Sequence, residues 1–144
     1  MGNRMYDALE ISKYIIDKCT AEKHPITNLQ LQKILYFLQK KNLVTFGKCL
    51  FDNDIEAWQF GPVVPEVYYQ YCGFGSSRIA MSYQVNIADE DIEMINPIIE
   101  DKRMKNPWDL VSETHAPGKA WDVIYRGGLG NKDVIPPDLI RTKG

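Results

Sequence analysis

The chain has little of what marks secreted, membrane-spanning or metal-binding proteins. Its longest apolar run, Ile34–Leu38, is far shorter than the roughly 20 residues that a membrane-spanning helix needs. The first ten residues contain no apolar signal segment, so we expect a cytoplasmic protein with no membrane partner. At 144 residues, the chain is predicted to form one domain over residues 1–144.

Cysteine and histidine are also scarce. Cys19, Cys49 and Cys72 are widely spaced and odd in number, which without a secretion signal favours reduced thiols. With His24 and His115 they form no spacing typical of a structural zinc site. We therefore expect no metal site.

Basic residues are nearly absent from the middle of the chain. Residues 49–101 carry ten acidic side chains and one basic one, whereas the flanking segments are net positive and the total charge is −2. An acidic middle disfavours a general phosphate binder, so we expect no nucleic-acid partner. A surface of both signs is compatible with a steered protein partner, and equally with an ordinary solvated surface.

Hydrophobic periodicity and capping signals predict a mainly α fold. We expect a compact single-domain helical bundle of five to seven helices with at most a small β-hairpin. The predicted helices span residues 7–20, 27–41, 65–73, 89–105, 107–115 and 118–126, and a last turn follows Pro137. Short extended pieces are expected at 49–51 and 55–58, and irregular chain at 74–88. Pro97 should kink the 89–105 helix or end a first short helix at Asn96.

The second helix has the clearest start. Thr27 and Gln30 have the spacing of a capping box, and Ile26 and Leu31 that of a hydrophobic staple. Lys40 and Lys41 are predicted to lie near its C-terminal end, where cations favour the helix dipole.

The segment "WQFGPVVPEVYYQY", residues 58–71, combines aromatic rings with glycine and prolines. Pro62 and Pro65 match the P-x-x-P pattern of a peptide ligand. A turn at Gly61 followed by a helix opening at Pro65 accounts for both prolines without a ligand role. We interpret the segment as a rigid corner that displays a binding surface.

Two other chemistries have candidate residues. Glu113 and His115 lie in "SETHAPG", where an acid–base pair would suggest an enzyme. Lys33, Lys40 and Lys41 on the second helix would suggest a DNA-binding regulator. Both stay open as alternatives.

Several motifs occur together in one order. They are Leu31-Gln32-Lys33-Ile34-Leu35-Tyr36, Ile55-Glu56-Ala57-Trp58, Gly61-Pro62-Val63-Val64, and the element from Leu110 to Thr114-His115. This pattern resembles the Panacea domain family, also called SocA-like or phage-associated GepA-type, over about residues 8–126. The family usually has Pro-Trp where this chain has Ala120-Trp121, and the tail after Gly127 is rich in turns.

The resemblance implies an antitoxin that neutralises a toxin encoded nearby by direct contact. One branch of the family is similar to adaptors that deliver the toxin to an ATP-dependent protease. Such a protease is the second partner that the resemblance implies. The resemblance implies no cofactor and no catalytic residue, so we predict that the chain is not an enzyme.

The motif does not identify contact residues, so we assign them from the corner. The predicted partner-binding residues are Trp58, Phe60, Pro62, Val63, Tyr68, Tyr69 and His115. The predicted structural residues are Gln32, Lys33, Tyr36, Glu56, Gly61, Pro65 and Thr114.

Overall fold

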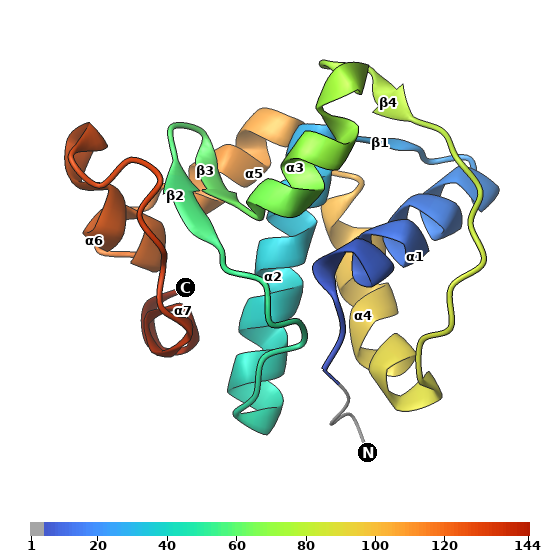
Figure 1. The fold of residues 1–144 in the computed structure, drawn as a ribbon, viewed down its shortest axis with the longest axis horizontal. Coiled ribbons are helices and arrows are strands. Elements are labelled where there is room, and N and C mark those ends of the chain that lie inside the picture. The colour runs from blue at the N-terminus through green and yellow to red at the C-terminus, as the bar shows by residue number, and fades with distance from the viewer. Residues whose placement is uncertain (1–4) are drawn as a thin grey trace.

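The computed structural model describes residues 5–144 (Figure 1), so residues 1–4 of the predicted domain lie outside the described part. Within it are seven α-helices: α1 (Ala8–Ala21), α2 (Asn28–Phe46), α3 (Pro65–Tyr71), α4 (Asp89–Lys102), α5 (Pro107–Thr114), α6 (Ala120–Tyr125) and α7 (Pro137–Lys143). Single 3-10 turns follow α3 and α6, at Cys72–Phe74 and Arg126–Gly128. The strands of this part form two small antiparallel pairs. The predicted mainly α fold class is confirmed.

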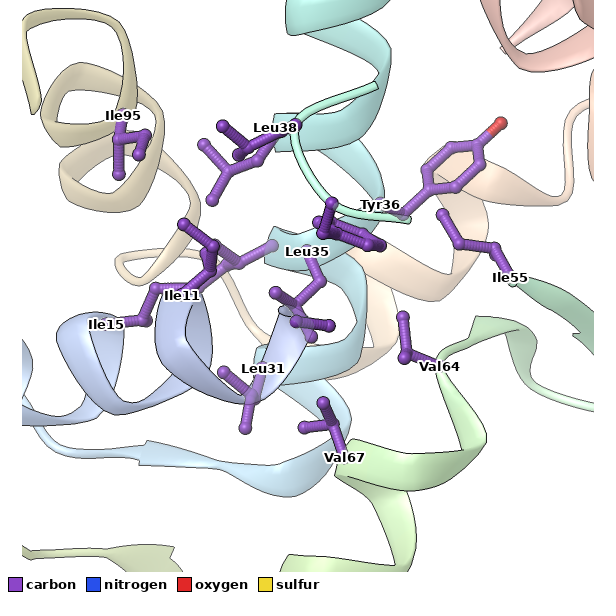
Figure 2. Close-up of a cluster of buried hydrophobic side chains, with 14 of the residues drawn as sticks. Ile11, Ile15, Leu31, Leu35, Tyr36, Leu38, Ile55, Val64, Val67 and Ile95 are labelled. Carbon is purple, nitrogen blue, oxygen red and sulfur yellow. The ribbon is translucent and has the colours of Figure 1, made fainter. Parts of the chain in front are cut away.

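Helix α2 lies at the centre of the fold, with α1, α3, α4, α5 and α7 packed against it (Figure 1). Its apolar side chains Leu31, Leu35 and Leu38 are fully buried. In Figure 2 they converge with side chains of α1 and α4, including Ile11 and Ile95. Because neighbours cover several sides of α2, polar side chains on its other faces are buried as well.

A capping box opens α2 where the sequence predicts it, and a second one opens α1. Asp7 accepts a hydrogen bond from the backbone N–H of Leu9, and Glu10 accepts one from the N–H of Asp7. At α2, Thr27 and Gln30 exchange the corresponding pair of bonds, at 3.2 and 2.9 Å. These contacts satisfy N–H groups that a helix start leaves without intrahelical partners.

The predicted end of α2 was wrong. The helix continues past Lys41 to Phe46, and stops at Gly47, whose φ of 69° is left-handed. Buried Asn42 and Leu43 keep this last part of the helix packed on the core. Lys40 and Lys41 therefore lie inside the helix and not in its last turn.

One strand pair was predicted in part and the other was not. Strand β2 (Glu56–Trp58) pairs with β3 (Gly61–Val63) in the hairpin, whose first strand lies within the predicted extended piece 55–58. Strand β1 (Ile26–Thr27) pairs with β4 (Arg78–Ile79). Strand β4 lies in the segment 74–88, which was predicted to be irregular. Each strand of this pair has two residues and they are far apart in sequence, so no local pattern announces them.

Helix α4 runs unbroken through Pro97, contrary to the predicted end at Asn96. Pro97 lies on the exposed side of the helix, as does Glu93 one turn earlier. Water can therefore satisfy the carbonyl of Glu93 that Pro97 leaves without its N–H partner. Ile95 and Ile99 on the opposite side are fully buried and hold both halves of the helix on the core.

The tail forms a helix where only a turn was predicted. Helix α7 packs against α2 and α6, and buries Ile140 (Figure 1). The ammonium of Lys40 donates a 2.6 Å hydrogen bond to the carbonyl of Gly144. Pro137 at the first helical position suits this start, because its missing N–H needs no partner there.

Candidate functional site

The N-terminal half of α2 holds the corner in place. The amide oxygen of Gln32 accepts a hydrogen bond from the backbone N–H of Val64 at 2.9 Å, and its nitrogen donates to Asn28 at 3.0 Å. Asn28 in turn donates to the carbonyl of Tyr68 at 3.2 Å. A chain of buried amides thus joins α2 to Val64, which connects β3 to α3, and to Tyr68 within α3.

Lys33 lies beneath the hairpin and is fully buried. Its ammonium donates a 3.0 Å hydrogen bond to the carbonyl of Pro62. Within residues 5–144, no carboxylate forms a salt bridge with Lys33. Burial without a counter-ion lowers the pKa of Lys33 to about 7, because removing the charge from water disfavours it.

Gly61 packs directly against this lysine. Its φ is 111°, and a Cβ built there would lie 2.7 Å from Cε of Lys33 and 2.8 Å from Oγ1 of Thr114. Neither the backbone angle nor the space admits a side chain. The fold thus brings together Lys33, Gly61 and Thr114, which lie far apart in the sequence.

Five aromatic side chains pack in two groups, which we together call the aromatic surface: Trp58, Tyr68 and Tyr69 form one group, and Phe60 and Trp108 the other. The ring of Tyr68 packs 5.0 Å from Trp58 and 5.4 Å from Tyr69, and Phe60 packs 5.2 Å from Trp108. The exposed fractions of Tyr69, Trp108 and Phe60 are 59%, 56% and 47%. Single exposed apolar residues are ordinary, whereas a group of them marks an interaction surface.

The sequence-based choice of contact residues differs from this surface at four residues: Trp108, Pro62, Val63 and His115. Trp108 was missed, although its position two residues before inward-facing Leu110 places it on the other side of α5. Pro62 and Val63 were chosen but are buried, since β3 packs on α2 and α5. We therefore leave these two out of the aromatic surface.

His115 packs against Trp121, which contacts the hairpin. Its ring stacks on Trp121 at 3.7 Å with an interplanar angle of 4°, and Trp121 stacks in turn on Tyr125. The indole N–H of Trp121 donates a 2.7 Å hydrogen bond to the carbonyl of Trp58. Burial, and then the charge of Lys33, lower the pKa of His115. His115 therefore packs on Trp121, and Trp121 in turn holds the hairpin through the carbonyl of Trp58.

Glu113 and His115 have separate surroundings. Residues two apart on a helix do not face each other. Glu113 forms salt bridges with Lys102, at 2.9 Å, and with Lys105. Burial alone would raise the pKa of Glu113, but hydrogen bonds from Lys105 and Lys102 outweigh it and hold that pKa below its ordinary value. The predicted acid–base pair is not brought together.

The three lysines of the DNA alternative are also separated in role. Lys33 is buried under the hairpin and cannot reach a phosphate. Lys40 is bound to the carbonyl of Gly144. Lys41 alone of the three is exposed.

Other predicted features fall elsewhere in the fold. Tyr36 is buried on α2, and its hydroxyl points away from the apolar cluster in Figure 2. Glu56 accepts a hydrogen bond from the indole N–H of Trp58, and Pro65 opens α3. Within residues 5–144, no group of three His, Cys, Asp or Glu side chains is arranged to hold a metal ion. The helices of the same range include none with the length and apolar character to cross a membrane.

A groove of about 440 Å³ opens beside the aromatic surface. Its apolar walls come from α2, the hairpin and α3, and include Leu29, Trp58, Phe60, Val63 and Tyr68. Asn28, Gln32 and Lys33, all of them buried, form its floor. Apolar walls with a few converging polar groups are typical of a binding site.

Comparison with known proteins agrees with the motifs. The family model described as "Antitoxin SocA-like, Panacea domain" matches residues 31–122. The chain is also 34% identical over 142 residues to Antitoxin SocA of Caulobacter vibrioides (strain NA1000 / CB15N), a match that covers 86% of this chain and 76% of that protein. No solved structure matches the chain. The chain therefore belongs to the antitoxin SocA-like, Panacea domain family.

Proposed function

We propose that this protein is an antitoxin that neutralises a toxin encoded nearby by binding it through the aromatic surface. Family membership supports the antitoxin role. The observation that carries the contact assignment is the exposure of Phe60, Tyr69 and Trp108. Phe60 also lines the apolar groove, together with Trp58 and Tyr68. Aromatic side chains at the centre of an interface contribute much of its binding energy.

The aromatic surface is held in place before any partner arrives. Glu56 binds the indole N–H of Trp58, and Trp121 binds its carbonyl. Lys132 lies over the ring of Trp58 at 5.1 Å. Side chains that are already ordered lose little entropy on binding, so this arrangement favours affinity.

The test begins by isolating the partner. The tagged protein is co-expressed with its genetic neighbours and recovered, and bound proteins are identified by mass spectrometry. We expect a bound protein that is toxic when expressed alone and harmless when co-expressed with this chain. Recovery of nothing but nucleic acid would contradict the proposal.

Tyr69→Ala then tests the surface. We expect the variant to bind the toxin about tenfold or more weakly, because an exposed aromatic contact is worth on the order of 1–2 kcal/mol. Phe46→Ala is the matched control, since Phe46 is an exposed aromatic residue at the far end of α2. Affinities are measured by calorimetry on variants with unchanged melting temperatures. Equal affinity of Tyr69→Ala and wild type would refute the surface assignment.

Contact and proteolysis are separable ways of neutralising the toxin. We include delivery to an ATP-dependent protease in the proposal as a consequence of binding, on the strength of the family resemblance. The half-life of the toxin in cells should then shorten when this protein is co-expressed, and Tyr69→Ala should restore it. An unchanged half-life with full protection of growth would leave contact as the whole mechanism.

A further inference from the structure

The floor of the groove holds the amine of Lys33, which no carboxylate of residues 5–144 pairs with and which a nearby anion would bring fully into its charged form. Lys33 has one acceptor, the carbonyl of Pro62, although an ammonium has three hydrogens to donate. None of the residues that line the groove is acidic. A buried charge without a partner is costly, and an opposite charge nearby reduces that cost.

The neighbouring amides add unused donors. The side-chain nitrogen of Asn28 donates to Tyr68, and that of Gln32 donates to Asn28, so each amide uses one of its two hydrogens. Both side chains are almost fully buried in the groove floor. The floor therefore offers donors and positive charge, and the complementary group is an acceptor with negative charge.

The walls of the groove determine which kind of residue can carry the negatively charged acceptor. Leu29 and Val63 are aliphatic, and Trp58, Phe60 and Tyr68 present aromatic rings. Such walls favour burial of an apolar side chain. A highly charged group such as a phosphate would leave most of its oxygens against apolar surface.

We propose that the groove receives an acidic side chain of the partner toxin, an aspartate or glutamate next to an apolar residue, with the carboxylate toward the floor and the apolar residue against the aromatic walls. This inference rests on the proposed function for the identity of the partner. Lys33 contributes charge from beneath the floor, where screening by water is weak. Asn28 and Gln32 contribute hydrogen-bond donors.

The test uses the purified protein and small probes, so it needs no toxin. The first probe, 3-phenylpropionate, joins an aromatic ring to a carboxylate, and 3-phenyl-1-propanol is its uncharged control. Binding is followed by the backbone amide signals of the isotopically labelled protein in NMR titrations. We expect the acid to shift signals of residues 28–33 and 61–63, and to bind at least fivefold more tightly than the alcohol.

Lys33→Met removes the charge but keeps an apolar stem of similar length. We expect this variant to lose the preference for the acid while it still binds the alcohol. A spectrum with native dispersion shows that the variant folds, and the comparison of acid with alcohol in wild type stands without any variant.

Three results would overturn the inference: equal affinity for acid and alcohol, shifts confined to other surfaces, or an unchanged preference for the acid in folded Lys33→Met. Its failure is distinct from failure of the antitoxin role. A toxin that binds through Tyr69 while the groove ignores the acid removes the inference alone. Preference for the acid without any toxin partner removes the proposed function alone.

Discussion

At the scale of the residue, the contact between Gly61, Lys33 and Thr114 decides how the hairpin sits on α2 and α5. Because Gly61 has no side chain, its backbone can lie directly against Lys33 and Thr114. This close approach lets the carbonyl of Pro62 reach the buried ammonium of Lys33. Without that hydrogen bond the ammonium would be buried with no acceptor at all, so the two features depend on each other.

Gly61→Ala should therefore destabilise the protein strongly. We expect a loss of roughly 2–4 kcal/mol in the free energy of unfolding, because a left-handed backbone angle and a steric clash act together. Urea unfolding measures this loss. Gly47→Ala is the control, since Gly47 also has a left-handed φ but has nothing within 4 Å of the added Cβ. Equal losses in the two variants would show that the clash with Lys33 does not matter.

Single residues were predicted unevenly. Gly61 was expected to turn the chain, but the hairpin turn is residues 59–60, and Gly61 follows it as the first residue of β3, paired with Trp58. The burial of Lys33 was not predicted, because a lysine on an amphipathic helix is ordinarily exposed. Trp108 is exposed although it was not chosen as a contact, and Pro62 is buried although it was chosen. The reason is similar: exposure depends on which elements pack nearby.

At the scale of the element, the capping boxes explain why α1 and α2 begin where they do. Both boxes are local, with all partners within three residues, so the sequence alone carries the signal. The end of α2 depended instead on whether Asn42 and Leu43 would find a core to pack against. Strand β4 likewise exists because the fold brings Arg78 and Ile79 beside β1.

Thr27→Ala tests the α2 start. We expect it to lower the free energy of unfolding by about 1 kcal/mol, because the N–H of Gln30 loses its acceptor. Thr45→Ala on the same helix should change stability little, since Thr45 is exposed and lies in the last turn, far from the capping box. Thermal unfolding of both variants makes the comparison. A loss of the same size in Thr45→Ala would mean that the box contributes nothing specific.

At the scale of the whole molecule, the core extends beyond the family match. Helix α7 lies after residue 122, where the matched region ends, yet it packs directly on α2. Its Ile140, together with Ile135 before the helix, belongs to the same apolar cluster as α1 and α4. The tail thus shares the core that holds the groove floor in place.

Ile140→Ala should cost about 2–4 kcal/mol in the free energy of unfolding, because it leaves a cavity between α7 and α2. Leu129→Ala is the control, as Leu129 is 84% exposed in the same tail. Chemical unfolding monitored by tryptophan fluorescence gives both values. If Ile140→Ala unfolds like wild type, α7 does not contribute to the stability of the core.

The sequence by itself determined the helical class, the starts of α1 to α5, and the family, because periodicity, caps and motifs are properties of neighbouring residues. The tertiary structure decided the rest. Only packing could bury Lys33 beneath Gly61, separate Glu113 from His115, and set Trp108 against Phe60. Those relations join residues far apart in the chain, and their energies arise when α2, the hairpin and α5 come together.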